Sequence, residues 1–442
     1  MSFSLPEAFV SGMRRQLGQE ADAFLAALEE PFQRGLRLNP RKPMMEAPEG
    51  ILEEVPWNPS TGRYLAADSA AGLDPLHEAG AYYIQEPSAM APVAVLAPKP
   101  GERVLDLCAA PGGKSTQIAD GLAGEGLLVC NEPVPSRARI LSRNIERMGV
   151  ANALVVSAKP EKLAPLWEDV FDAALVDAPC SGEGMFRRHP ETRTEWTAQS
   201  PEGCAGRQKG ILDCAARMVR PGGRLVYSTC TFNLLENEGV IEDFLRHHPD
   251  WEAMAFTLPI GGGRTLEAPE GLLHLYPHQL RGEGHFVALL HRKGEASPTP
   301  LLAASTALDV PEKPMLQAFG DFMHAFGFLP PPTAQLGDTL LSALELPPLK
   351  GIPVLRAGMQ LGALKGRVFA PDHGLVMALN CQWEYPRIHL DRAGALRYQR
   401  GETLPTDCKG YVLVCYQGLT LGFGKGADGQ LKNHYPKGLR RA

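Results

Sequence analysis

Residues 76–293 alternate short apolar runs with longer amphipathic segments, and few folds accommodate that alternation. The runs are RVLDLCA (103–109), GLLVCNE (126–132), ALVVSA (153–158), AALVDAP (173–179), GRLVYSTC (223–230) and HFVALLH (285–291). Those up to residue 230 are bounded by Gly or Pro and separated by segments long enough for crossover helices. Apolar strands of this kind are typical of parallel sheets that are buried on both faces. We therefore predict an α/β domain with a doubly wound parallel sheet over 76–293.

The rest of the chain divides into three further parts. Residues 1–75 combine a helical pattern at 8–28 with the basic, extended stretch RGLRLNPRK at 34–42. Residues 294–350 begin as a linker rich in Pro, Ser and Ala and then favour helix, broken by PPPT near residue 331. Residues 351–442 contain short strands with Gly turns, which predicts a small β-rich domain.

The net charge of −6 hides an uneven distribution. Residues 351–442 contain 13 Lys and Arg against 6 Asp and Glu, whereas the first 350 residues contain 31 against 44. A basic end on an acidic body is typical of a protein that approaches a polyanion, although small basic domains also occur without that role. Within this end, Lys425 and the tail 431–441 with Tyr435 suit backbone contact and base stacking.

The composition also indicates in which cellular compartment the protein is located. No apolar run reaches the length of a membrane span, and the first residues lack the apolar stretch of a secretion signal. The nine cysteines include no metal-type CxxC pair, so we expect reduced thiols, no disulfide framework and no metal site. We predict a cytoplasmic protein without a membrane partner, and we expect a monomer.

A glycine-rich turn follows the strand at 103–109 and opens a helix. Pro111, Gly112 and Gly113 allow a sharp turn with bare N–H groups, and Ser115 or Thr116 can cap the helix. The turn has neither the GxGxxG nor the GxxxxGK[ST] pattern. It is either an ordinary β–α turn or a nucleotide-type cofactor loop.

The next predicted strand favours the cofactor interpretation. It ends at Glu132, about twenty residues beyond the loop, where a carboxylate can hold both hydroxyls of a ribose. Arg137 lies one turn further on. In combination with the loop, these residues predict an adenosine-containing cofactor.

Two cysteines lie at the tips of successive predicted strands, Cys180 after Asp177 and Cys230 after Thr229. Because ligands of open α/β sheets bind beyond the carboxyl ends of the strands, both thiols should reach one site. We expect Asn233 and Glu236 to form a capping box whose helix keeps Cys230 as a thiolate. Most other cysteines are expected to pack as small hydrophobes.

The segment SGEGMFRRHPETRTEW (181–196) lies between the two cysteines and is too glycine-rich and charged for a core. One interpretation is a lid, with Phe186 or Trp196 stacking on a base and Arg187 or Arg188 contacting phosphate. The other is a solvated loop.

Together these segments resemble the Sun-domain RNA 5-methylcytosine methyltransferases. The matching stretches are RGLRLNPRK (34–42), QEPSAMAP (85–92), DLCAAPGGKS (106–115), NEP (131–133), DAPCSGEGMFRR (177–188), RQKGILDCA (207–215), LVYSTCTFNLLENE (225–238) and GEGHFVALL (282–290). GEGMFRR, the PH at 277–278 and the basic end resemble most the branch that acts on small-subunit ribosomal RNA. In that branch a PUA-like RNA-binding domain follows the catalytic unit.

The resemblance implies a Rossmann-like S-adenosylmethionine-dependent methyltransferase with an N-terminal α+β, RNA-binding region (1–75) and a C-terminal PUA-like domain (351–442). It implies that Glu132 and Arg137 hold the ribose end of S-adenosylmethionine. The loop along that cofactor would be Cys108, Ala109, Ala110, Pro111, Gly112, Gly113 and Lys114. Asp177 would lie between cofactor and base, Cys230 would be the nucleophile, and Cys180 would release the product. Many members place an Asp after the third strand, where this chain has VVSAKPEKL (155–163).

The chemistry needs these residue types independently of the resemblance. Carbon 5 of cytosine is a poor nucleophile, so a thiolate must first add at carbon 6. An acid near N3 then stabilises the adduct, with Asp177 as the candidate, protonated or hydrogen-bonded. Cys180, directly or through water, is the candidate base that removes the carbon-5 proton.

Three hypotheses of function remain open on these residues. The first is a 5-methylcytosine methyltransferase acting on small-subunit ribosomal RNA, either free or in the assembled subunit, with transfer RNA as the alternative substrate. The second is a non-catalytic RNA-binding assembly factor. A nicotinamide dehydrogenase ranks last because its GxGxxG fingerprint is absent.

Overall fold

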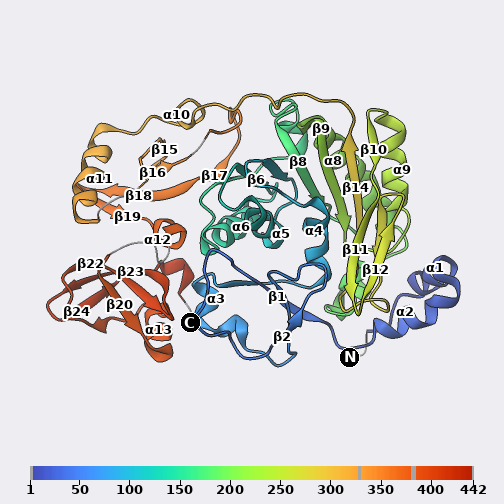
Figure 1. Cartoon of the computed structure of the whole chain (residues 1–442), viewed down its shortest axis with the longest axis horizontal. Helices are drawn as coiled ribbons and strands as arrows, with labels where there is room; N and C mark the ends of the chain where they lie inside the picture. Colours follow the sequence, from blue (N-terminus) through green and yellow to red (C-terminus); the bar gives the residue numbers. More distant parts are fainter. Residues whose placement is uncertain (1–2, 327–329, 344, 380–384, 441–442) are drawn as a thin grey trace.

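A nine-stranded mixed sheet organises the centre of the molecule (Figure 1). The computed structural model describes residues 3–326, 330–343, 345–379 and 385–440. The strand order is β10-β14-β9-β8-β5-β6-β7-β17, and β13 also pairs with β14. In that order the strands are Trp251–Ala253, His285–Arg292, Val219–Thr229, Phe171–Asp177, Arg103–Asp106, Leu127–Asn131, Ala153–Val156 and Val354–Ala357, with β13 at Leu272–Leu275.

The five strands from β9 to β7 pair in parallel, as the apolar runs predict. Successive residues of a strand face opposite sides of the sheet. Leu105 packs with α7 (Pro160–Leu163), α8 (Ser200–Met218) and α9 (Glu238–His247). Val104 packs on the other face with α4 (Ala91–Leu96), α5 (Gly113–Leu122) and α6 (Pro135–Arg147). Helices on both faces confirm the Rossmann-like α/β prediction.

The N-terminal region is an α+β unit, as predicted. Helices α1 (Glu7–Leu17) and α2 (Ala21–Ala27) precede an antiparallel sheet of order β2-β3-β1-β4. Its strands are Ile51–Glu54, Gly62–Leu65, Arg34–Leu38 and Tyr82–Ile84. The last strand lies beyond residue 75, so the chain returns to this sheet before it enters the central one.

Two cations of the basic stretch at 34–42 are buried and join the N-terminal region to the central domain. Arg37 donates to Thr116 Oγ1 at 2.5 Å, and Lys42 donates to the Arg147 carbonyl at 3.0 Å. These two side chains are therefore structural.

The connector contains less helix than its composition predicts. Helices α10 (Ala304–Ala307) and α11 (Lys313–Phe326) are present, but Ala334–Leu336 and Thr339–Ser342 form strands β15 and β16. These pair with β18 (Met359–Lys365), which pairs with β19 (Val368–Pro371). The predicted division at residue 350 therefore runs through one small sheet.

Strand β17 was expected in the C-terminal β-rich part but extends the central sheet. It pairs antiparallel to β7, with Val354 opposite Val156 and Ala357 opposite Leu154. The reason is the open edge of β7, whose unpaired backbone groups need a neighbouring strand. After β19, helix α12 (His373–Leu379) leads to the last domain.

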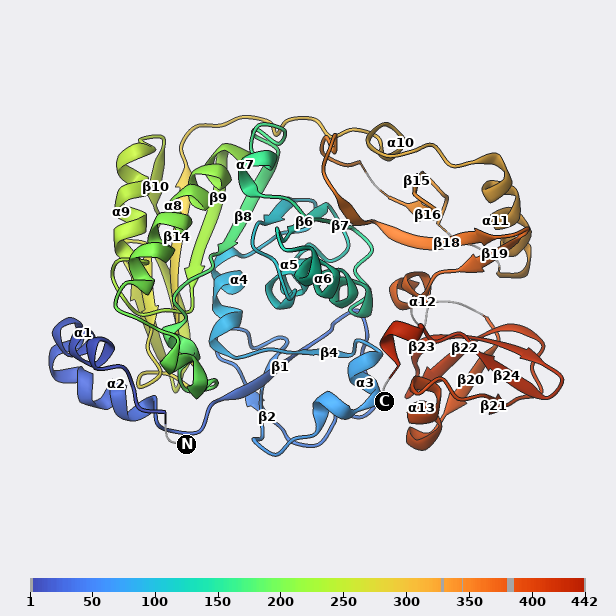
Figure 2. The same ribbon diagram turned by 180° about the vertical axis from the view of Figure 1, so that it is seen from behind.

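The C-terminal domain is a five-stranded sheet of order β20-β22-β23-β24-β21. Its strands are Arg387–Leu390, Gly410–Tyr416, Leu419–Ala427, Gln430–Asn433 and Leu404–Pro405, with α13 at Arg392–Gln399. From behind (Figure 2), this domain lies beside α3 (Pro75–Glu78), and α3 contacts both α13 and β23. The small β-rich domain is thus present, and Cys381 lies outside the described residues.

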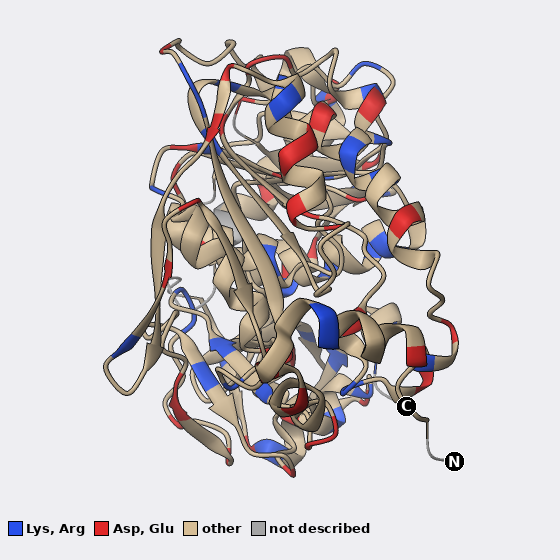
Figure 3. Ribbon diagram, turned by 90° about the vertical axis from the view of Figure 1, so that its right-hand side faces the viewer, with Lys and Arg blue, Asp and Glu red and all other residues tan. Residues whose placement is uncertain are grey.

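Acidic and basic residues are mixed on the side of the molecule that carries α8 and α9 (Figure 3), without a large patch of either sign. No helix among the described residues is long and apolar enough to cross a bilayer.

Candidate active site

A cavity of about 420 Å³ lies beyond the carboxyl ends of β5, β8 and β9. The central domain supplies its floor and one wall, and the segment after β4 supplies another wall. Its lining includes Tyr83, Gln85, Glu86, Asp106, Cys108, Ala109, Ala110, Pro111, Gly113, Lys114, Asp177, Met185, Arg188, Cys230, Glu283 and His285. This is the position at which open α/β sheets bind ligands.

The glycine-rich loop is held in place from α6. Asn144 Nδ2 donates to the Pro111 carbonyl at 2.9 Å, and Arg137 Nη2 donates to the Ala110 carbonyl at 3.1 Å. Gly112 has φ +113°, and a Cβ there would lie 3.2 Å from Leu141 Cδ1. The turn therefore requires glycine for both its backbone conformation and its closeness to α6.

Asp106, the last residue of β5, is a buried carboxylate in the cavity wall. Its Oδ2 accepts from Ser115 Oγ at 2.6 Å, whereas its Oδ1 has no hydrogen-bond partner. Burial raises the pKa of Asp106 to about 7, and the nearby Asp177 adds to the rise. Ser115 thus serves Asp106, and the structure contradicts its expected role as a helix cap, because Ser115 and Thr116 both lie inside α5.

Glu132 and Arg137 lie close together at the end of β6 and the start of α6. Glu132 is buried, its Oε1 accepts from the Val134 N–H at 2.9 Å, and its Oε2 lies 3.3 Å from Arg137 Nη1. Neither side chain lines the cavity described above. The structure therefore places this pair outside the cavity, beside the glycine-rich loop whose Ala110 carbonyl accepts from Arg137.

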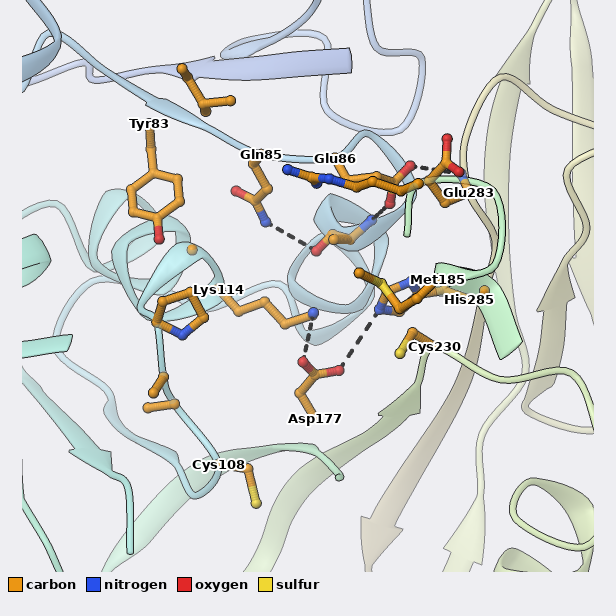
Figure 4. A pocket seen from close by; sticks show the side chains of 18 of the residues that line it. Tyr83, Gln85, Glu86, Cys108, Lys114, Asp177, Met185, Cys230, Glu283 and His285 are labelled. Atoms are coloured by element: carbon orange, nitrogen blue, oxygen red, sulfur yellow. Dashed lines mark hydrogen bonds and ion pairs between the residues drawn. The ribbon is translucent and has the colours of Figure 1, made fainter. Parts of the chain in front are cut away.

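Asp177 is the carboxylate of the cavity that faces both Lys114 and His285. Lys114 Nζ lies 2.8 Å from its Oδ2, and Ser228 Oγ donates to its Oδ1 at 2.7 Å. Figure 4 shows Lys114 and His285 approaching the carboxylate from two sides, with His285 Nε2 at 3.7 Å from Oδ1. Burial alone would raise the pKa of Asp177, but Lys114 and His285 outweigh it and hold that pKa well below its usual range.

The two strand-tip cysteines meet, as predicted. Cys180 Sγ and Cys230 Sγ are 3.2 Å apart, and Cys230 lines the cavity while Cys180 lies behind it. The hydrogen bond with Cys230, together with burial, raises the pKa of the Cys180 thiol well above its usual value. Cys180 is therefore a thiol that can donate to the Cys230 sulfur.

Two buried carboxylates hold the loops that carry the cysteines. Glu236 accepts from the Ser181 N–H at 2.9 Å, from Gln208 Nε2 at 2.8 Å and from Asn233 Nδ2 at 2.7 Å. Glu183 accepts from the Phe232 N–H at 2.8 Å. The two cysteine loops are thus bound to one another through side chains.

Asn233 and Glu236, which we expected to form a capping box at the start of a helix, lie in a turn before the helix. Asn233 and Glu236 do bond reciprocally, with the Glu236 N–H donating to Asn233 Oδ1 at 3.0 Å. Helix α9, however, begins at Glu238. Its N-terminus is therefore not the group directly behind Cys230, where the Cys180 thiol lies.

The lid interpretation of 181–196 holds only for Arg188. Phe186 is fully buried against the N-terminal helices, and Trp196 packs in the same cluster. Arg187 is buried and makes two 2.8 Å hydrogen bonds to Glu283. Arg188 is exposed and lines the cavity, and its guanidinium lies 6.0 Å from the centre of the Phe32 ring, so of the four residues named for the lid it is the one placed to meet a ligand in the cavity.

Several site residues were not found from the sequence. Asp106, Glu183 and His285 lie within the sequence motifs quoted above. Their carboxyl and imidazole groups are the feature from which a role in the site could have been predicted. Gln85 and Glu86 precede the central sheet, and only the fold places them over the cavity.

Four family models match consecutive parts of the chain. They describe the N-terminal domain of 16S rRNA methyltransferase RsmF (residues 5–87), 16S rRNA methyltransferase RsmB/F (93–291), the RsmF rRNA methyltransferase first C-terminal domain (324–379) and the methyltransferase RsmF PUA domain (385–441). With the sheet and the glycine-rich loop, they define a Rossmann-like, S-adenosylmethionine-dependent methyltransferase that carries a PUA domain.

Relatives that match over nearly the full length of the chain identify the family within this class. The chain is 32% identical to ribosomal RNA small subunit methyltransferase F of Erwinia tasmaniensis, over 99% of this chain and 97% of the relative. It is 33% identical to the protein of the same name from Escherichia coli, over 99% and 96%. The chain therefore belongs to the ribosomal RNA small subunit methyltransferase F family.

Solved structures share the catalytic part of the fold. A methyltransferase homologue from Pyrococcus horikoshii is 29% identical, has a TM-score of 0.54, and covers 66% of this chain and 96% of its own. NSun6 from the same organism, solved with SFG, has a TM-score of 0.54 at 22% identity over 67% of this chain and 100% of its own. The second likeness shows the fold alone.

Proposed function

We propose that this protein transfers the methyl group of S-adenosylmethionine to carbon 5 of a cytosine in small-subunit ribosomal RNA through a covalent Cys230 adduct. One observation carries the proposal. Two thiols from adjacent strands meet at 3.2 Å, and one of them opens into a cavity whose wall is a glycine-rich cofactor loop. Family membership supports the same substrate class.

The residues present fit the cofactor. The orphaned, buried Asp106 Oδ1 is an acceptor suited to an ammonium group such as that of S-adenosylmethionine. Glu132 lies at the strand tip where a carboxylate binds ribose hydroxyls. When bound, S-adenosylmethionine supplies an electrophilic methyl group. The loop from Cys108 to Lys114 would hold it, with Arg137 near its ribose.

Cys230 would attack carbon 6 of a cytosine that is splayed out of its stack. The Cys180 thiol, 3.2 Å away, is placed to donate a hydrogen bond to the attacking sulfur. Asp177 stays ionised beside Lys114, so it accepts hydrogen bonds, for example from the exocyclic amino group that cytosine has and uracil lacks. This acceptor role replaces the protonated form considered for Asp177.

Cys180 would then act in product release. Its pKa is raised chiefly by the hydrogen bond with Cys230 and by burial, and the charge on Cys230 adds to the rise. Once Cys230 is bonded to carbon 6 it carries no charge, so the contribution of Cys230 to the raised pKa weakens and Cys180 can lose its proton to solvent. The Cys180 thiolate, directly or through water, then takes the carbon-5 proton, after which Cys230 leaves.

Single cysteine variants test this division of roles. Cys230→Ala should transfer no methyl group, and Cys180→Ala should accumulate a protein–RNA adduct that survives denaturing electrophoresis. Calorimetry with S-adenosylmethionine should show binding by both variants. Full methyl transfer by Cys230→Ala would contradict the mechanism, and no binding by the native chain would favour a non-catalytic assembly factor.

RNA contact would come from both ends of the chain. In the C-terminal part, Lys365, Lys425 and Lys432 gather around His434, whose pKa is lowered by partial burial and then by these three cations. Lys425 also lies 5.3 Å from the centre of the Tyr411 ring. Tyr435 is buried among its neighbours and is not available for stacking. The proposed RNA-binding role of residues 351–442 therefore rests on exposed lysines, and that of residues 1–75 on the exposed Arg14 and Arg15.

A further inference from the structure

His285 is a buried imidazole whose outer nitrogen faces the cavity. It is the first residue of β14, it is 5% exposed, and it lines the cavity together with Asp177 and Cys230. Its Nδ1 lies 2.8 Å from the Gly284 carbonyl oxygen. A carbonyl oxygen only accepts, so Nδ1 carries a hydrogen.

The Nε2 atom of His285 makes no direct hydrogen bond to a described residue, and the Asp177 Oδ1 that faces it lies 3.7 Å away, beyond hydrogen-bond length. With Nδ1 protonated, Nε2 is a bare acceptor in the neutral ring and a donor in the imidazolium. The imidazolium would face the Asp177 carboxylate at 3.7 Å. A buried polar atom is rarely left without a partner, so a ligand in the cavity is expected to supply one.

Asp177 itself cannot supply a proton in this setting. Its Oδ2 is bound to Lys114 and its Oδ1 to Ser228, at 2.8 and 2.7 Å. Yet the addition of Cys230 to carbon 6 places electron density on N3 of cytosine, and a proton there stabilises the adduct. The site therefore needs another proton donor on the side where Asp177 lies.

We propose that His285 is the catalytic acid: its Nε2 gives a proton to N3 of the target cytosine as the Cys230 sulfur bonds to carbon 6. The step balances within the site. The S–C6 bond forms, the N3–H bond forms, and the imidazolium becomes neutral. When carbon 5 loses its proton and the S–C6 bond breaks, N3 returns its proton to Nε2. The inference rests on the proposed function.

The groups around His285 determine its pH dependence. The other titratable or charged residues that line the same cavity are Tyr83, Glu86, Asp106, Cys108, Lys114, Asp177, Arg188, His189, Cys230 and Glu283. Cys230 must be ionised and His285 protonated at the same time. Methyl transfer should therefore rise and then fall as the pH increases.

The pH profile of single-turnover methyl transfer tests the assignment. His285→Gln keeps a polar side chain but cannot deliver a proton as imidazolium does. We expect its rate to fall about 100-fold or more and its profile to lose the falling limb, with unchanged affinity for S-adenosylmethionine. His291→Gln is the matched control, because His291 lies on the same strand, is paired with Glu252 at 3.3 Å, and is outside the cavity.

RNA with 5-fluorocytidine at the target position separates addition from release, because fluorine at carbon 5 blocks the final elimination. His285→Gln should form the trapped adduct slowly, whereas the control variant His291→Gln should form it at the native rate. An unchanged rate in His285→Gln, or a retained falling limb, would overturn the assignment and point to Lys114.

The pH profile of single-turnover methyl transfer by the native enzyme is a test that does not depend on the folding of a variant. A native profile without a falling limb at high pH would also overturn the assignment of His285. A native chain that makes no 5-methylcytosine would instead overturn the proposed function.

Discussion

At the residue scale, the buried polar groups of the site fall into two kinds. Some already have hydrogen-bond or ion-pair partners within the protein, and others have an atom that makes no hydrogen bond. Arg187 and Phe186 stand in a glycine-rich, charged loop, yet both are buried by the N-terminal helices and Glu283. Asp106 Oδ1 makes no hydrogen bond, and His285 Nε2 has only the Asp177 carboxylate near it, at 3.7 Å. Residue type alone does not separate these cases, because burial depends on segments that are distant in the sequence.

Asp106 gives a pH-dependent prediction for cofactor binding. With a pKa of about 7, its carboxyl group is largely neutral at lower pH and ionised at higher pH. An ammonium ligand favours the ionised form, so affinity for S-adenosylmethionine should rise about 5- to 8-fold between about pH 6 and about pH 7.5. Calorimetry across this range checks it. Asp106→Asn should bind more weakly with a flat profile, and a flat profile in the native chain would contradict the assignment.

At the element scale, the parallel strands could be predicted because each is a local apolar run between turn residues. The Rossmann-like order follows from crossover connections, and the meeting of Cys180 with Cys230 follows from that order. β15, β16 and β17 could not be predicted, because each is short and is stabilised by partners far along the chain. β17 in particular pairs with β7 from about two hundred residues away, a contact that no local pattern records.

The turn after Cys230 depends on Glu236. This fully buried carboxylate accepts from Ser181, Gln208 and Asn233. Glu236→Gln places an amide among those donors, so the free energy of unfolding should fall by about 2–3 kcal/mol, and methyl transfer should fall because the cysteine loops separate. Denaturant unfolding measures the first effect. Glu242→Gln, on the exposed side of α9, should change it by less than about 0.5 kcal/mol, and equal midpoints for the two variants would contradict this role.

At the scale of the whole molecule, the modules are joined by a buried ionic cluster. Glu146 of α6 pairs with Arg356 of β17 and with His373 of α12, whose Nε2 lies 3.1 Å from the Leu421 carbonyl of β23. Burial opposes ionisation of Glu146, but His373 and Arg356 outweigh it and lower its pKa to about 2. The C-terminal domain is thus attached to the catalytic domain through polar contacts that fix its position.

The basic cluster of the C-terminal part should set the salt dependence of RNA binding. Replacing Lys365, Lys425 and Lys432 with Gln removes three exposed cations. The slope of log affinity against log salt should become shallower by about 2, with cofactor affinity unchanged. Filter binding of small-subunit ribosomal RNA at several salt concentrations measures the slope, and an unchanged slope would place the RNA contacts elsewhere.

The most direct test of the account compares ribosomal and transfer RNA from a strain that lacks this protein, after complementation with the native chain or with Cys230→Ala. Bisulfite sequencing locates 5-methylcytosine in each RNA. We predict that at least one cytosine of small-subunit ribosomal RNA loses its methyl group in the deletion strain, regains it with the native chain and stays unmethylated with Cys230→Ala. Methylation restored by Cys230→Ala, or a loss confined to transfer RNA, would contradict the account.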